Sequence, residues 1–127
     1  MKYFAFLLLP GLALAAPSPI TIDYPLPNSL FPSDFTAPTF LFRDPGSSAS
    51  WRVEITFDDG TAPLKLPIAA EPMRIGKIDE RCIANTNELP KLTPQQQATR
   101  TWKPDADTWA AIKKHPSATI AFTEASS

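Results

Sequence analysis

The sequence predicts a mainly β domain: a sandwich of short strands with a small helix, at about residues 105–114, before the last strand. Proline makes up 15 of the 127 residues, well above the usual share of about 5%, and prolines mark the ends and edges of short strands. Several short runs alternate apolar and polar residues, which is the period of a half-buried strand. The apolar content of 43% excludes a disordered chain.

Residues 1–16 have the pattern of a secretory signal peptide. Lys2 supplies a short positive region, an apolar run covers residues 3–14, and Ala13 and Ala15 form a small-residue cleavage site. The run is shorter than the roughly 20 apolar residues of a membrane-spanning helix. We therefore expect an exported protein, periplasmic or extracellular, without stable membrane insertion after cleavage.

The charge of the mature chain excludes some partner classes. Of 12 basic residues, Lys2 belongs to the signal peptide, which leaves 11 basic against 13 acidic side chains and a net charge of −2. The basic residues are scattered, whereas nucleic acids and anionic membranes call for a basic stripe. We expect protein partners, either neighbouring domains of a longer chain or an envelope protein, with glycans as an alternative.

The first strands are predicted in a proline-rich region. Residues 17–38 predict an extended lead-in that contains an edge strand around Ile20 and Ile22. The sandwich domain is predicted over residues 39–127, and it begins with a strand at 39–44.

The clearest element is a hairpin that begins with WRVEITF. Alternate side chains of this strand face one way and predict a structural core: Trp51, Val53, Ile55 and Phe57. Asp59 and Gly60 are a strong turn signal. The return strand, 64–68, alternates again, and Pro63 and Pro67 predict that it lies at the edge of a sheet.

The second half contains weaker signals. Met73 and Ile75 suggest a short strand, and residues 78–90 are expected to be irregular with one helical turn. Thr93 is a suitable cap for a helical turn that Pro94 begins, and RTWK follows as a strand.

The C-terminal part predicts a helix and then a strand. The helix has Asp105 and Asp107 in its first turn and lysines in its last, as the helix dipole favours. Trp109 and Ile112 lie three residues apart and share the face that packs on the core. The strand, 117–124, directs alternate apolar residues to one face.

This element order predicts a sandwich of the immunoglobulin or fibronectin-III type. Such sandwiches have about seven strands, whereas the pattern indicates five or six, and the chain stops soon after an apolar strand. We therefore expect a sandwich that is incomplete at its C-terminus, or a fragment of a longer product. If the chain ends at Ser127, the strand at 117–124 would be a bare edge, which invites pairing.

Two stretches carry a resemblance to a known group. YPLPNSLFPSDFTAPTFLFRD, followed by WRVEITFDDG, resembles the opening of fibronectin-III-like domains in secreted bacterial proteins. Asn28-Ser29 replaces the usual glycine turn there, and Phe42 stands where tryptophan is common. Residues 74–113 are similar to the amino-terminal sandwich of large exported bacterial proteins, whose longer relatives continue into multihaem cytochrome-like or β-propeller regions. The resemblance implies a truncated accessory domain and supplies no catalytic residues.

The acidic residues are explained by local structure. Asp105 and Asp107 form a D-x-D, but the glycine and oxygen ligands of a calcium loop do not follow, so helix capping is expected. Asp58 and Asp59 precede the glycine of a turn and suit turn chemistry rather than a glycosidase pair. We expect no metal site.

A catalytic role has little to support it. His115 is the only histidine and stands at a predicted helix end, and no G-x-S-x-G elbow is present. A Cys82–His115 dyad is the only nucleophile–base pair available. Cys82 is expected to be a free, buried thiol, with pairing to another chain or to a part of a longer parent protein as the alternative. No C-x-x-C motif occurs, and we expect no cofactor and no catalytic residue.

The tryptophans leave two interpretations. Trp51, Trp102 and Trp109 could form a platform that stacks on sugars, or they could belong to the core, which is favoured for Trp51 and Trp109 by their apolar neighbours. The sequence therefore predicts a non-catalytic accessory and interaction module of a larger secreted protein. A carbohydrate-binding module is the alternative, and a small hydrolase is a remote one.

Overall fold

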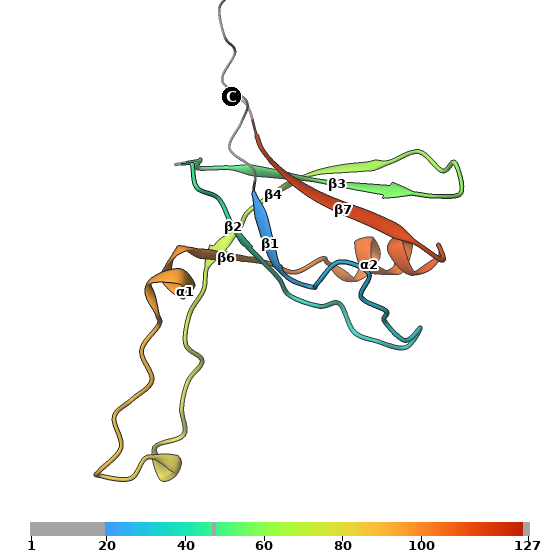
Figure 1. The fold of residues 1–127 in the computed structure, drawn as a ribbon. Helices are drawn as coiled ribbons and strands as arrows, with labels where there is room; N and C mark the ends of the chain where they lie inside the picture. The colour runs from blue at the N-terminus through green and yellow to red at the C-terminus, as the bar shows by residue number, and fades with distance from the viewer. Residues whose placement is uncertain (1–19, 47, 126–127) are drawn as a thin grey trace, which may run out of the picture.

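The fold consists of two antiparallel sheets packed face to face (Figure 1). This computed structural model describes residues 20–46 and 48–125, so the predicted signal peptide lies outside the described residues. One sheet has the strand order β1-β2-β6-β5 and the other β4-β3-β7. The strands are β1 (Thr21–Tyr24), β2 (Phe40–Arg43), β3 (Trp51–Phe57), β4 (Leu64–Ile68), β5 (Glu71–Pro72), β6 (Thr99–Trp102) and β7 (Ala118–Glu124). The helices are η1 (Glu80–Cys82), α1 (Pro94–Ala98) and α2 (Ala106–Lys113).

This architecture confirms the mainly β, sandwich-like fold at the level of two packed sheets. The predicted hairpin forms, because β3 pairs antiparallel with β4 from Trp51↔Ile68 to Ile55↔Leu64. Gly60 in its turn has a φ of 81°, a conformation that glycine adopts without a steric cost. β4 lies at a sheet edge, as its prolines predict.

The proline-rich lead-in is part of the sandwich. β1 pairs antiparallel with β2, and the register shifts between Ile22 and Tyr24 because Asp23 forms a bulge. The Asp23 carboxylate accepts hydrogen bonds from Nε and Nη2 of Arg43 at 2.7 and 2.8 Å. The Arg43 guanidinium lowers the pKa of Asp23, so this edge strand is held to β2 by a forked ion pair.

Helix α2 closes one end of the sandwich. Asp105 caps it, accepting a hydrogen bond of 2.7 Å from the backbone N–H of Thr108. The indole Nε1–H of Trp109 donates to the backbone carbonyl of Phe35 at 2.8 Å, and the ring of Phe31 meets the indole edge-on. The helix thereby holds the 25–39 segment against the end of the two sheets.

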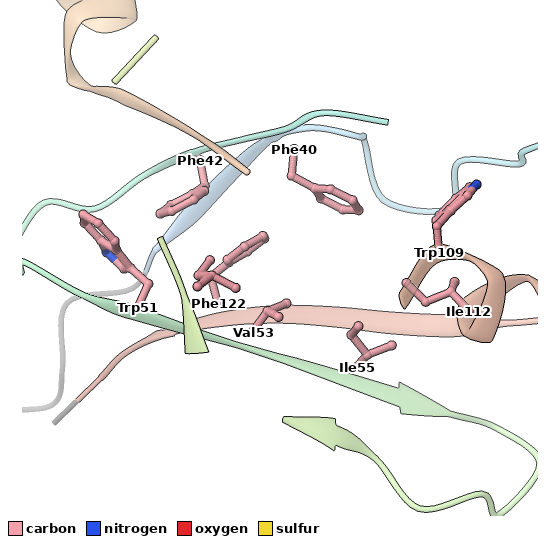
Figure 2. Close-up of a cluster of buried hydrophobic side chains, with 9 residues drawn as sticks. Phe40, Phe42, Trp51, Val53, Ile55, Trp109, Ile112 and Phe122 are labelled. Atoms are coloured by element: carbon pink, nitrogen blue, oxygen red, sulfur yellow. The ribbon is translucent and has the colours of Figure 1, made fainter. Parts of the chain in front are cut away.

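The core lies between the sheets and extends to α2 (Figure 2). Phe42, Val53 and Ile55 are the largest fully buried side chains. The buried cluster comprises Phe40, Phe42, Trp51, Val53, Ile55, Ile68, Trp109, Ile112 and Phe122. Phe57, the last residue of β3, packs against the cluster and is half-buried.

The prediction of a strand at Met73 and Ile75 is wrong in its position. The pairing residues are instead Glu71 and Pro72, which lie opposite Thr101 and Arg100 of β6. Met73 still donates its N–H to the carbonyl of Thr99, at 3.0 Å. Thr99 is the first residue of β6 and α1 precedes it, so no strand lies opposite Ile75, which is exposed.

Residues 73–93 form an arm that projects away from the sandwich (Figure 1). The arm contains η1, which has no buried residue, and Asp79 caps it by accepting from the N–H of Arg81 at 2.9 Å. Cys82 is exposed, so the expectation of a buried thiol is wrong. Cysteine is among the most often buried residues, but the arm offers no core in which to bury it.

We predict that Trp109→Ala lowers the free energy of unfolding by about 3–5 kcal/mol, because it removes a buried ring from the end of the core. Denaturant unfolding measures this. The control is Ala110→Ser on the exposed face of the same helix, expected within about 0.5 kcal/mol of the wild type. A loss of less than about 1 kcal/mol in the free energy of unfolding for Trp109→Ala would contradict the role of α2 in closing the end of the sandwich.

Candidate functional site

The three tryptophans do not share an exposed face. Trp51 and Trp109 are 6% and 7% exposed and belong to the core. The indole Nε1–H of Trp51 donates to Oδ2 of Asp44 at 2.9 Å, and the guanidinium of Arg100 lies 5.8 Å from the centre of its ring. A platform made of all three rings is therefore absent, because the alternation of β3 and the apolar face of α2 turn two of them inward.

Trp102 is half-buried and lines a shallow pocket. Its ring packs against Phe40 and Phe122, with centroids 5.4 and 5.7 Å away. The pocket has a volume of about 200 Å³ and is lined by Leu66, Pro67, Ile68, Trp102, Lys103, Asp105 and Thr108. Its lining thus combines apolar side chains with one basic and one acidic residue.

The two aspartates of the D-x-D stretch stabilise the N-terminus of α2. Asp105 is the N-cap residue, one position outside the predicted first turn, and the N–H of Thr108 lowers the pKa of its carboxyl. Asp107 occupies the first turn, where the helix dipole favours a negative charge. Within the described residues, no three His, Cys, Asp or Glu side chains cluster as a metal site would require.

His115 and Asp59 form a contact that the sequence did not predict. Nδ1 of His115 lies 2.5 Å from Oδ2 of Asp59, and the imidazole stacks on the ring of Phe57 with centroids 3.8 Å apart. Oδ1 of Asp59 accepts from the N–H of Thr61 at 3.0 Å. The hydrogen bonds from Thr61 and His115 lower the pKa of Asp59 to about 2. This cluster ties the end of α2 to the β3–β4 turn.

The Cys82–His115 dyad does not form. Figure 1 shows η1 at the tip of the arm, whereas the C-terminal end of α2 lies beside the β3–β4 hairpin on the opposite side of the molecule. His115 is instead engaged by Asp59. The structure therefore does not bring Cys82 and His115 together.

Three of the four sheet edges carry features that discourage pairing. β1 has a bulge and an ion pair at Asp23. β4 contains Lys65 and Pro67, and β5 is two residues long and contains Pro72. Charges, prolines, bulges and short length are the devices that protect natural sheet edges.

The fourth edge, β7, has none of these features. β7 is seven residues long, and β3 is its only partner within the part of the chain that the structure describes. It contains no proline, and its single charged residue is Glu124, at its end. Its outer face presents the exposed small side chains of Thr119, Ala121 and Thr123. This bare edge is the strongest candidate functional site.

The hydrogen-bonding direction along β7 follows from one contact. The N–H of Ala125 donates to the carbonyl of Ser50 at 3.1 Å. Backbone groups alternate between the two sides of an antiparallel strand, so Thr119, Ala121 and Thr123 also direct their N–H and C=O groups to β3. The backbone groups of Ile120 and Phe122 point to the free edge, as do those of the two end residues of β7.

No protein-family model, curated protein or solved structure matches this chain. The resemblance to sandwich modules of exported bacterial proteins therefore rests on the residues quoted for it. No helix within the described ranges is long and apolar enough to cross a membrane. What the chain can do is inferred from the geometry of its own residues.

We predict that Asp59→Asn destabilises the protein at neutral pH and that this effect disappears in strong acid. The pKa of Asp59 in the fold is about 2, below its ordinary value of 3.8, so the ionised carboxylate stabilises the fold above that ordinary value. The contribution is lost as the pH falls through about 2. Thermal unfolding of both proteins between neutral pH and strong acid measures the gap in Tm. A difference in Tm that stays constant or widens on acidification would contradict a stabilising role of the contact between Asp59 and His115.

Proposed function

We propose that this chain is a non-catalytic, exported β-sandwich module that binds another protein by adding one of its strands to the free edge of β7. The observation that carries the proposal is the contrast between β7 and the other three edges. Bare, regular strand edges are templates for pairing. A strand added there gains main-chain hydrogen bonds, which give affinity, and contacts with alternate side chains, which give specificity.

The strand order supports an immunoglobulin-like module. In that fold one sheet is A-B-E-D and the other contains C, F and G, with C′ added beside C in some domains. If β1 to β7 correspond to A, B, C, C′, D, E and F in turn, the observed orders become A-B-E-D and C′-C-F. In this correspondence no strand of the described residues takes the place of strand G, whose position is the free edge of β7. We infer that the partner strand occupies the position of strand G.

A non-catalytic role is supported by the structural contacts and positions of the residues that were considered as catalytic candidates. His115 is engaged by Asp59 and stacks on Phe57. Asp105 caps α2, and the thiol of Cys82 lies on an arm away from these groups. Each of these side chains has a local structural role or stands alone. The export signal predicted for residues 1–16 supports a site of action outside the cytoplasm.

We predict an alternating pattern of amide exchange along β7. In the free monomer, the N–H groups of Ile120 and Phe122 exchange rapidly with deuterium because they face the free edge, whereas those of Ala121 and Thr123 are protected by bonds to β3. Hydrogen exchange followed by NMR measures each amide separately. Protection of Ile120 and Phe122 in a chain shown to be monomeric would mean that the edge is already covered, and would overturn the proposal.

A second candidate function is glycan binding at Trp102. It is favoured by the pocket beside this ring, which Lys103 and Asp105 line together with apolar side chains. Aromatic rings at such places stack on the apolar faces of ligands while a few polar groups fix their orientation. This site uses one tryptophan rather than the three-ring platform.

We predict that, if this second function holds, an oligosaccharide shifts the tryptophan emission of the wild type to shorter wavelength and leaves the emission of Trp102→Phe unchanged. Trp51 and Trp109 are buried and report the intact core in both proteins. Fluorescence titration with a panel of oligosaccharides measures the shift. Emission that is indifferent to every glycan, or a shift that persists in Trp102→Phe, would remove this candidate.

A further inference from the structure

We propose that the strand bound at the free edge of β7 is β7 of a second copy of this chain. The two strands pair antiparallel about a two-fold axis at Ala121 and join the two three-stranded sheets into one continuous sheet. This inference rests on the proposed function of the edge, and it names the partner. Isologous contacts of this kind, in which one surface meets itself, are the commonest in protein dimers.

The backbone of β7 fits this axis. A two-fold at Ala121 superposes the whole of β7 on its copy, and it places Ile120 opposite Phe122 of the second copy. Both residues direct their N–H and C=O groups to the free edge, so they form a hydrogen-bonded pair. Ala121 directs its groups to β3, so the two copies of Ala121 meet as a non-hydrogen-bonded pair. The axis is thus consistent with the alternation that the Ala125–Ser50 bond fixes.

The side chains of β7 are complementary to themselves in this register. On the inner face Ile120 meets Phe122 of the second copy, a β-branched and aromatic pair that stabilises antiparallel strands. On the outer face Thr119 meets Thr123, and a threonine pair is also favourable. Glu124 lies opposite Ala118, so the two carboxylates do not face each other.

Other two-fold registers fit less well. An axis at Ile120 or at Phe122 preserves the hydrogen-bond alternation but shortens the overlap of the two strands. The axis at Phe122 also sets Glu124 against the apolar side chain of Ile120. Ile120 is only half-buried within one chain, and the axis at Ala121 places it beside Phe122 of the second copy.

The rest of the molecule leaves room for the pairing. The 73–93 arm departs from β5 and β6 in the other sheet, and Figure 1 shows it pointing away from β7. β4, with its lysine and proline, forms the opposite edge of the same sheet. The combined sheet therefore ends on a protected strand on both sides, which closes the assembly at two copies.

A cysteine at position 121 tests the register directly, in a Cys82→Ser background that removes the native thiol. In a non-hydrogen-bonded pair the two Cα atoms lie about 4.5 Å apart, within the span of a disulfide. We expect Ala121→Cys to form disulfide-linked dimers under mild oxidation. Thr119→Cys is the matched control, because its two copies would lie about 13 Å apart, four residues along the strand. Equal linkage of the two variants would overturn the proposed register.

A charge exchange at the same position tests the pairing without a covalent bond. Ala121→Lys sets two like charges face to face, and we expect the dimer Kd to rise at least about tenfold. An equimolar mixture of Ala121→Lys and Ala121→Glu is expected to dimerise again, because opposite charges then meet. The same exchange at the exposed Ala69, outside the strands, is the control and leaves the Kd unchanged. Sedimentation equilibrium measures the dimer Kd of the wild type, of the variants and of the mixtures.

The outcomes separate this inference from the function on which it rests. A wild-type chain that stays monomeric up to about 1 mM, with rapidly exchanging amides at Ile120 and Phe122, overturns the second copy and leaves the edge open to another protein. A monomer in which these amides are protected overturns both. A dimer whose Kd is unaffected by Ala121→Lys overturns the contact through β7.

Discussion

The contact of Phe122 with the opposite sheet is the interaction on which the rest of the fold depends. Its ring stacks on Phe42 with centroids 4.5 Å apart and an angle of 15° between the planes. Trp102 of β6 approaches the same ring edge-on. A residue of the outermost strand of one sheet thus packs at the centre of the other sheet's aromatic face. Because of this contact, β7 is both a core strand and an edge strand.

This double role explains why β7 lacks the protection of the other edges. A bulge in β7 would disturb the alternation that brings Ile120 and Phe122 to the core, and a proline would remove a ladder hydrogen bond or break the packing. β1 and β5 contribute no residue to the buried cluster and carry an ion pair and a proline, whereas β4 contributes Ile68 and has its proline at the exposed position 67. A regular strand with an unpaired side is the consequence, and the proposed second strand would replace water as the partner of its backbone groups.

Much of the fold could be predicted from alternation alone. β3 and β4 were predicted within their observed bounds, and β7 within one residue, because a half-buried strand shows its period directly in the sequence. β5 could not be located in this way, since two residues have no period and their position is set by where β6 begins. The exposure of Cys82 was missed for a related reason, because residue type predicts burial only where a core is nearby.

The candidate site was predictable in outline and not in detail. The sequence indicated that 117–124 would be a bare edge if the chain ends at Ser127, whereas the direction of each backbone group required the register with β3. The contact of His115 with Asp59 joins residues 56 positions apart, and neither the turn nor the helix end carries a signal for the other. The burial of Trp109 followed from its helical spacing to Ile112, while the half-burial of Trp102 depends on its neighbours in space.

Pairing of the free edge of β7 with the same strand of a second copy would bring two molecules into contact along this strand. An isotope-filtered NOE experiment on an equimolar mixture of labelled and unlabelled chain tests it most directly, because it detects only contacts between different molecules. For pairing about an axis at Ala121, we expect intermolecular contacts between Ile120 and Phe122 and between Thr119 and Thr123. Contacts that arise from the 73–93 arm, with none from β7, would contradict it.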